Sequence, residues 1–146
     1  MHFTSRVRGV TNIKIGIGTA PGLSPGCYIQ GGGEIEIGDY TIVAPNVGII
    51  SANHNPYDYR RTERGVVKIG RYCWLGMNAI ILPNVELGDH TIVAAGSVVT
   101  KSFPHGYCVV GGVPAHLLKH LDPGHVVESR NRYEYYGYLP KDEYEG

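Results

Sequence analysis

The sequence is poor in several features that would mark a protein class. Its 146 residues include three cysteines, Cys27, Cys73 and Cys108, and no C-x-x-C pair. These are too few for a disulfide framework and show no zinc-ligand spacing, so we predict that Cys27 and Cys73 are small core residues. No run reaches the roughly 18 to 20 apolar residues of a membrane-spanning helix, and the opening MHFTSRVRG lacks the apolar stretch of a signal peptide. We therefore expect a cytoplasmic protein without a membrane span.

A surplus of positive charge is also absent. Thirteen Lys and Arg residues balance thirteen Asp and Glu residues, which gives a formal net charge of +0 at pH 7. Proteins that bind nucleic acids neutralise the backbone phosphates with clustered basic residues, and nothing here resembles such a cluster. The sequence therefore predicts no nucleic-acid partner.

The chain is rich in residues that favour strands and turns. Ile and Val together outnumber Leu and Ala by about two to one, and 21 Gly and 9 Pro residues are spread along the chain. β-Branched residues favour strands, whereas Gly and Pro disfavour helix interiors. A chain of this length usually forms one core, so we expect a single, mainly β domain.

A six-residue repeat organises the chain. From Ile69 the sequence reads IGRYCW, LGMNAI, ILPNVE, LGDHTI, VAAGSV and VTKSFP. Six consecutive hexads begin with an aliphatic residue: Ile69, Leu75, Ile81, Leu87, Val93 and Val99. The fifth position of the first five hexads is small or β-branched: Cys73, Ala79, Val85, Thr91 and Ser97. The same register occurs earlier, with first positions at Leu23, Ile29, Ile37, Val43 and Ile49, and fifth positions at Thr41, Val47 and Asn53.

This period predicts a coil of short strands joined by turns. Neither the 3.6-residue period of a helix nor the alternation of an ordinary strand requires one aliphatic residue at every sixth position. If each hexad forms one strand and three hexads form one turn of the coil, residues 18 apart stack in the core. We therefore predict three stacked pairs: Ile69 beneath Leu87, Leu75 beneath Val93, and Ile81 beneath Val99.

The segment SANHNPYDYRR, residues 51–61, interrupts the repeat. Without it the hexad after Ile49 would begin at residue 55; if Ile69 occupies that same face, about fourteen residues have been inserted. Such an insertion forms a projecting loop, which we place at about residues 54–67. His54 lies where the coil ends and the loop begins. This position suits a catalytic side chain on a rigid support, and it equally suits a solvated surface histidine.

Longer motifs carry a resemblance to a known family. APNVGIISANHNP (44–56) and KIGRYCWLGMNAIILPNVELGDHTIVAAGSVVTKSFPHGYCVVGGVPAHLLK (68–119) resemble the maltose, galactoside and capsular-polysaccharide O-acetyltransferase branch of the hexapeptide-repeat acyltransferases. The resemblance depends on the loop histidine, CWLG, AAGSVVTKSFP and GGVPA in this order and spacing. It implies a left-handed parallel β-helix, acetyl-CoA as co-substrate without a metal, and a homotrimer with active sites between subunits.

The resemblance assigns His54 as the catalytic base. In the family a histidine on this loop takes the proton from an acceptor hydroxyl as that oxygen attacks the thioester, so no acyl-enzyme is needed. Imidazole suits this task because its ordinary pKa of about 6.5 lies close to neutral pH. The implied activity is acetylation of a hydroxyl on a sugar or polysaccharide precursor.

The resemblance also places acetyl-CoA along the outside of the coil. The positions that match the family's contacts are Trp74, Ala95, Thr100, Lys101 and Lys119. After VPA the family often has arginine, whereas this chain has His116. Histidine is not a fixed cation at neutral pH, so contact with the nucleotide phosphates would depend on Lys119. Trp74 also fits an interface residue, and Lys101 also fits an ordinary surface position.

The acceptor is expected beside His54. Aromatic and hydrogen-bonding side chains there suit the apolar faces and hydroxyls of a sugar, and the candidates are Asn53, Tyr57, Asp58 and Arg60. Surface loops also carry such residues for solubility, and Asn53 equally fits a turn or ladder position. Tyr28 and Gln30 in PGCYIQGG match no family role.

Three other functions fit parts of the sequence. The acceptor could be an amine, as in an amino sugar, which would give an amide product. The coil could be an inactive scaffold, which would not bind acetyl-CoA. Zinc-dependent carbonic anhydrases share the fold but need several coil histidines, and only His90 could join His54 here. The remaining prediction is that four histidines are solvated: His90, His105, His120 and His125.

The domain boundaries follow the repeat. Residues 1–122 are assigned to the β-helix domain, with a short helix at about 114–121 because Leu117, Leu118 and Leu121 fall on one helical face. Residues 123–146 form a polar, tyrosine-rich tail without a period. This tail could be disordered or lie across a neighbouring subunit.

Overall fold

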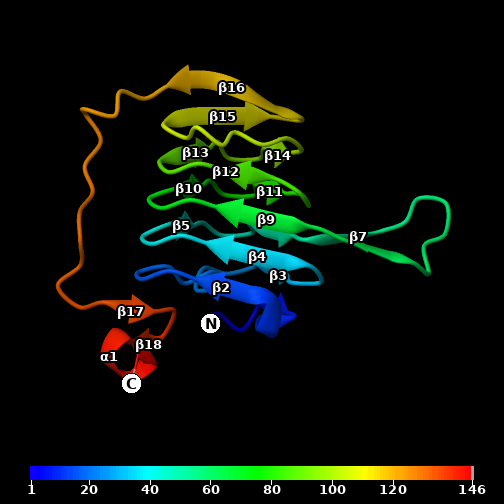
Figure 1. Ribbon diagram of the computed structural model, residues 1–146, viewed down its shortest axis with the longest axis horizontal. Helices are drawn as coiled ribbons and strands as arrows, with labels where there is room; N and C mark the ends of the chain where they lie inside the picture. The colour runs from blue at the N-terminus through cyan, green and yellow to red at the C-terminus, as the bar shows by residue number, and fades with distance from the viewer. Residues whose placement is uncertain (146) are drawn as a thin grey trace.

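The chain forms a coil of short strands that stack into three sheets (Figure 1). A computed structural model describes residues 1–145. The first sheet contains β1 (Arg6–Arg8), β3 (Tyr28–Gln30), β6 (Gly48–Ile50), β11 (Ile80–Ile81) and β14 (Val98–Val99). The second contains β2 (Ile13–Ile15), β4 (Glu34–Ile37), β9 (Val66–Ile69) and β12 (Glu86–Leu87). The third contains β5 (Ile42–Val43), β10 (Trp74–Leu75), β13 (Thr91–Val93), β15 (Cys108–Gly112) and β16 (Ala115–His120).

The predicted stacking of residues 18 apart is confirmed. Parallel pairing places Ile69 opposite Leu87, Leu75 opposite Val93, and Ile81 opposite Val99. Across the interruption, Ile37 pairs with Ile69, 32 positions later. This separation is one eighteen-residue turn plus the fourteen inserted residues, so the coil resumes in register after the insertion. The 3-10 helix η1 (Val10–Asn12) joins β1 to β2 in the first turn.

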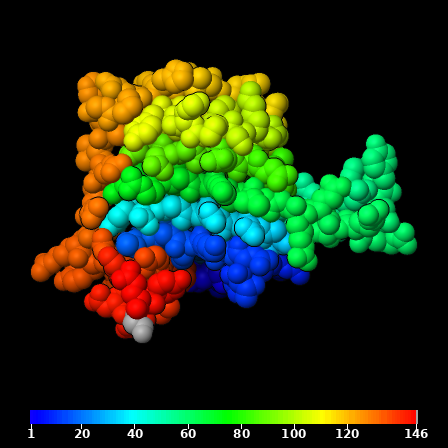
Figure 2. Space-filling model, viewed as in Figure 1, coloured from blue at the N-terminus to red at the C-terminus, as the bar shows by residue number. Residues whose placement is uncertain are grey.

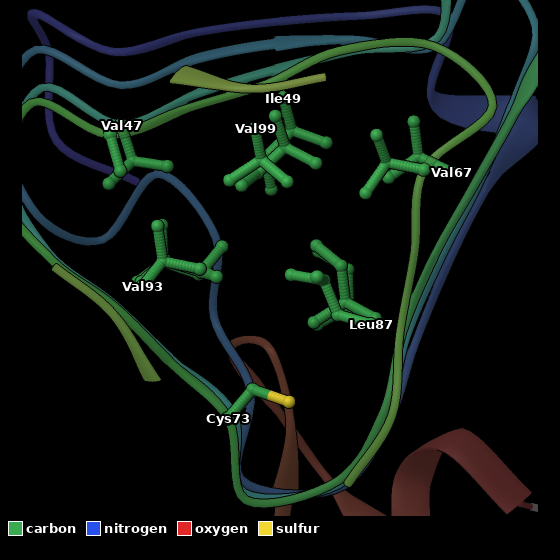
Figure 3. Packing of buried hydrophobic residues seen from close by; sticks show 14 of the residues in the cluster. Val47, Ile49, Val67, Cys73, Leu87, Val93 and Val99 are labelled. Carbon is green, nitrogen blue, oxygen red and sulfur yellow. The ribbon is translucent and has the colours of Figure 1, made fainter. Parts of the chain in front are cut away.

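The inward aliphatic residues fill the triangular interior of the coil. Figure 3 looks into this core, with Val47, Val67 and Cys73 near the three corners and Ile49, Leu87 and Val99 between them. All of these labelled residues are buried. Each fully buried aliphatic side chain stabilises the fold by about 1.5–3 kcal/mol. Cys27 and Cys73 are 2% and 1% exposed, which confirms their prediction as core residues.

The fourth position of each regular hexad turns a corner with left-handed backbone geometry. The φ angles are 53° at Tyr72, 63° at Asn78, 65° at Asn84 and 54° at His90, and Gly96 follows at 72°. This geometry costs roughly 1–2 kcal/mol for most residues and least for Gly and Asn. The repeat therefore constrains the fourth position as well as the first and fifth.

Two positions of the predicted register do not face the core. Leu23 is 58% exposed and belongs to no strand. The segment around it makes a wider corner than the regular repeat does, because the core residues Cys27 and Val47 are 20 positions apart instead of 18. Asn53 is exposed because the chain has already left the coil at that point. The six-residue register is thus strict from Ile69 onward and looser before it.

The predicted helix at about 114–121 is wrong, because residues 115–120 form strand β16. β16 runs antiparallel to β15, with Val110 opposite Leu117. β15 ends the parallel stack of the third sheet, and β16 satisfies the backbone groups of its open edge. A helix would need a surface on which to bury its apolar face, but Leu117 and Leu118 are 45% and 62% exposed.

Two segments lie outside the coil (Figures 1 and 2). The insertion forms an antiparallel hairpin, β7 (Ala52–His54) and β8 (Thr62–Arg64), that projects from one corner. After β16 the chain returns along another corner to β17 (Tyr135–Tyr136), β18 (Leu139–Pro140) and α1 (Lys141–Glu145) beside the first turn. The tail thus packs on its own coil. Within residues 1–145, no helix has the length and apolar character needed to cross a membrane.

Candidate functional site

His54 is the last residue of β7, and its side chain is exposed beside the coil. Its Nδ1 lies 2.6 Å from the carbonyl oxygen of Tyr59. A carbonyl oxygen only accepts hydrogen bonds, so in the neutral ring Nδ1 carries the proton and Nε2 presents its lone pair. This tautomer is the one that a base acting through Nε2 requires.

Asn55 holds the loop that supplies this carbonyl group. Its Oδ1 accepts hydrogen bonds from the backbone N–H groups of Tyr57 and Asp58, at 2.8 and 2.9 Å. Its Nδ2 donates to Glu63 Oε1 on the returning strand, at 2.6 Å. Sequence analysis missed this role, although an Asn-Pro pair favours a turn in which the asparagine side chain caps later N–H groups.

Gln30 and Ser51 attach the hairpin to the coil. Gln30 Oε1 accepts a hydrogen bond from the Ala52 N–H group at 3.0 Å, and Gln30 Nε2 donates to the Ala52 carbonyl at 3.1 Å. The fully buried Ser51 donates from Oγ to the Gln30 carbonyl at 2.8 Å and accepts from the Gly33 N–H group at 2.9 Å. These contacts fix the backbone two residues before His54.

The four acceptor candidates all lie on the hairpin with His54. Asn53 pairs with Glu63 in the ladder, and Tyr57 is 97% exposed. Asp58 and Arg60 form an ion pair with an N–O distance of 2.8 Å, and hydrogen bonds from Arg60 lower the pKa of the Asp58 carboxyl. Asp58 and Arg60 are therefore already paired with each other, and an acceptor would compete with that pair.

The residues predicted to bind acetyl-CoA are spread over the coil and do not surround His54. Trp74 lies on the outer side of the third sheet, 52% exposed, between Ile42 and Ile92 of the adjacent turns. The other candidates are Ala95 in the turn after β13, Thr100 and Lys101 after β14, and Lys119 on β16. The chain leaves the coil at His54 between the first and second sheets, whereas Trp74 is the first residue of β10, just after the corner between the second and third sheets. One chain therefore does not bring His54 and Trp74 together.

His90 is buried, so the prediction that it is solvated is wrong. It is 6% exposed, and its ring stacks between those of Tyr72 and Tyr107, with centroid distances of 5.2 and 5.0 Å. Its Nε2 lies 2.9 Å from Glu128 Oε1 of the tail. Residues 1–145 contain no group of three or more His, Cys, Asp or Glu side chains that could hold a metal ion.

The repeat is matched by a known family. The family described as "Bacterial transferase hexapeptide (six repeats)" matches residues 67–101, the stretch in which the 18-residue stacking is regular. The match to this hexapeptide-repeat family is thus confined to the regular part of the coil. The hexapeptide-repeat match covers β9 to β14 and lies between the hairpin and the tail.

Proteins that are similar to this chain are named acetyltransferases. Galactoside O-acetyltransferase of Escherichia coli (strain K12) is 32% identical over 93 residues, which are 60% of this chain and 45% of that protein. The crystal structure of a maltose O-acetyltransferase from Clostridium difficile 630 has a TM-score of 0.74 and 32% identity, over 82% of this chain and 65% of that one. A hexapeptide-repeat acetyltransferase of Vibrio cholerae O1 biovar eltor, solved with acetyl coenzyme A, has a TM-score of 0.65 and 29% identity, over 76% of this chain and 61% of that one. The chain spans about half the length of the curated relatives it matches.

Proposed function

We propose that this protein is an acetyl-CoA-dependent O-acetyltransferase that acts on a hydroxyl of a sugar or polysaccharide precursor. The named relatives support acetyl transfer, and the Vibrio structure with acetyl coenzyme A supports the donor. The coil would have the left-handed sense that its resemblance to the family implies. The O-acetyltransferase names of the galactoside and maltose relatives favour an ester product over an amide.

The observation that carries the proposal is the hydrogen bond between His54 Nδ1 and the Tyr59 carbonyl. It leaves Nε2 as the basic atom of the neutral ring. As the acceptor oxygen attacks the thioester carbonyl carbon, Nε2 takes the hydroxyl proton; when the C–S bond breaks, the CoA sulfur leaves with the bonding pair and receives that proton. A base of this kind contributes ~10² to 10⁴ in rate, or about 3 to 5 kcal/mol.

A homotrimer would complete the site. Because His54 and Trp74 lie at different corners of one chain, a site that uses both needs two copies of the chain. In this arrangement the pantetheine arm lies along the coil between subunits, where Ala95 and Thr100 allow a close approach. Lys101 and Lys119 are the candidates for the nucleotide phosphates, since both are exposed cations.

The acceptor would bind at the hairpin. Tyr57 offers an exposed aromatic face, and Asn53 offers an amide within one residue of His54. Aromatic faces and amides are suited to the apolar faces and hydroxyls of a sugar. Asp58 and Arg60 would contribute as a pair, because their ion pair presents both a carboxylate and a guanidinium at the loop.

Two measurements test this function. A calorimetric titration with acetyl-CoA should show binding, whereas its absence would favour an inactive scaffold. Acetyl transfer from acetyl-CoA should then be assayed with maltose, a methyl galactoside and an amino sugar, by following release of the CoA thiol. Mild base releases an acetyl ester readily and leaves an amide intact, so base treatment of the product separates the proposed O-acetylation from N-acetylation.

A further inference from the structure

The C-terminal tail lies against one corner of the coil along its length. After β16 it runs past the corner between the second and third sheets and reaches β17 beside the first turn (Figures 1 and 2). Side-chain contacts attach it there, among them an ion pair between Arg71 and Glu128 with an N–O distance of 3.7 Å. His90 Nε2 lies 2.9 Å from Glu128 Oε1, Tyr72 Oη donates to the Ser129 carbonyl at 3.1 Å, and Tyr40 Oη donates to Glu134 Oε1 at 3.1 Å.

The corner beneath the tail is a column of stacked rings. Tyr40, Tyr72, His90 and Tyr107 come from four successive turns, with centroid distances of 5.2, 5.2 and 5.0 Å. The column exists because each of these residues turns the same corner with a positive φ. Backbone hydrogen bonds hold the far end of the tail, from Gly18 N–H to the Tyr135 carbonyl at 2.7 Å and from Gly137 N–H to the Thr19 carbonyl at 3.2 Å. The tail is therefore held against this corner by hydrogen bonds along its length.

A cleft of about 350 Å³ lies between the tail and the third sheet. The coil contributes Ile42, Tyr72 and Trp74, and the tail contributes Val127, Ser129 and Asn131. Its volume is within the roughly 300–1,000 Å³ that is typical of small-molecule sites. The apolar side chains Ile42 and Val127 are 62% and 81% exposed, so the cleft offers apolar surface to a ligand.

The chemistry of the cleft suits a neutral ligand that carries hydroxyl groups. No Lys or Arg is among the described residues that line it, and its one histidine, His90, is paired with Glu128. Arg71 and Arg130, which are next in sequence to lining residues, line a separate pocket, and Arg71 is paired with Glu128. The lining of the cleft itself therefore offers no cation to the phosphates of a nucleotide. The Trp74 indole N–H, the Ser129 hydroxyl and the Asn131 amide are hydrogen-bonding groups set among aromatic and aliphatic surface, which is the combination that binds sugars.

We propose that residues 127–131 of the tail form one wall of a saccharide subsite, with Trp74 as the opposite wall. This inference rests on the proposed function and extends its acceptor site from the hairpin to the tail. Of the cleft residues, Trp74 is also a donor candidate, so a saccharide in the cleft lies next to the proposed acetyl-CoA groove. The other donor candidates, Ala95, Thr100, Lys101 and Lys119, do not line the cleft.

Trp74 is a built-in reporter for this subsite, because the chain has one tryptophan. Titration of the full-length protein with maltose or a methyl galactoside should change the Trp74 fluorescence in a saturable way. Asn131→Ala should raise the midpoint of that titration and the acceptor KM by roughly three- to tenfold, the effect of losing one or two neutral hydrogen bonds. The KM for acetyl-CoA should stay unchanged.

Arg132→Ala is the matched control, since Arg132 is the next residue of the tail but lies over the Tyr133 ring and does not line the cleft. It should leave both KM values unchanged.

A second pair of variants tests the attachment of the tail to the coil. Tyr72→Phe removes the hydrogen bond to the Ser129 carbonyl and should raise the acceptor KM. Tyr107→Phe keeps the ring column and should leave the acceptor KM unchanged.

The outcomes separate this inference from the proposed function. If the wild type transfers acetyl groups but Asn131→Ala leaves the acceptor KM unchanged, or changes the KM for acetyl-CoA instead, the saccharide subsite is refuted and the transferase activity stands. A lack of any Trp74 fluorescence change with the saccharides at high millimolar concentration also refutes the subsite. A wild type that binds saccharide through Asn131 but transfers no acetyl group refutes the transferase proposal alone.

Discussion

The side-chain amide of Gln30 forms two hydrogen bonds with the backbone of Ala52, one to its N–H group at 3.0 Å and one to its carbonyl at 3.1 Å. Gln30 thus pairs with Ala52 as a neighbouring strand would. These two hydrogen bonds continue the pairing of the first sheet by one residue, at the point where the chain leaves the coil. Since His54 is two residues further on, the position of its ring depends on this contact.

Gln30→Met keeps the length of the side chain and removes both hydrogen bonds. The partly buried N–H and carbonyl groups of Ala52 would lose their partners, at a cost of about 1–3 kcal/mol. We expect a lower unfolding free energy in urea and a lower kcat for acetyl transfer, with unchanged acetyl-CoA binding. Tyr28→Phe on the same strand is the control and should match the wild type. A Gln30→Met enzyme with wild-type stability and kcat would show that the contact is dispensable.

Asn55→Ala removes the three hydrogen bonds that order the loop at Tyr59. Without them the Tyr59 carbonyl is no longer held against His54 Nδ1, so both tautomers of the ring become populated. We expect kcat to fall about tenfold while acetyl-CoA affinity is retained. Asn55→Asp keeps the two N–H contacts and loses the donor to Glu63, so it should be intermediate. The ¹⁵N chemical shifts of the His54 ring measure the tautomer directly, and a ring that stays fully Nδ1-protonated in Asn55→Ala contradicts the argument.

Leu87→Ala tests the stacked core. Leu87 is 1% exposed and pairs with Ile69 below it. Loss of a buried leucine side chain typically costs 2–5 kcal/mol, because the removed contacts are not replaced and a cavity remains, and we expect about that loss in urea unfolding. Ile42→Ala on the outer side of the coil, where Ile42 is 62% exposed, should cost less than about 0.5 kcal/mol. Equal effects of the two substitutions would mean that Leu87 is not part of a packed core.

The Cys73 thiol gives the stability a dependence on alkaline pH. Burial raises the pKa of this thiol from 9.0 to about 11, because the folded protein disfavours the thiolate. The contribution of the protonated thiol to the unfolding free energy is therefore complete below about pH 9. It is lost as the pH rises from about 9 to about 11, at ~1.4 kcal/mol per pH unit. Cys73→Ala should remove this part of the pH dependence when unfolding free energies are compared between pH 8 and pH 10.5. If the unfolding free energies of the wild type and Cys73→Ala changed in parallel with pH, the Cys73 thiol would not be the cause of this pH dependence.

The coil was predictable from the sequence because its physical cause is periodic. One aliphatic residue in six leaves few alternatives, and the pairs Ile69–Leu87 and Ile81–Val99 follow from counting alone. The positions of Leu23 and β16 were not predictable in this way. Leu23 lies in a corner of irregular length, and the segment of β16 has a helical pattern that is overridden by the open edge of β15.

The candidate site was predictable only in part, because its geometry depends on contacts between distant segments. The interruption of the repeat marks His54 as a residue at the edge of the coil. The tautomer of its ring depends on the Tyr59 backbone, and the base of the hairpin depends on Gln30, which precedes Ala52 by 22 positions. The burial of His90 depends on rings 17 and 18 positions away and on Glu128 of the tail. None of these relations leaves a local pattern in the sequence.

We propose that the His54 imidazole takes the proton from the acceptor hydroxyl. The most direct test is the turnover number of His54→Ala for acetyl transfer, measured with saturating acetyl-CoA on a protein shown to keep its oligomeric state and its calorimetric affinity for acetyl-CoA. We expect the turnover number to fall at least about a hundredfold, because the variant loses its general base and little else. A His54→Ala protein that turns over at a rate near that of the wild type would contradict it.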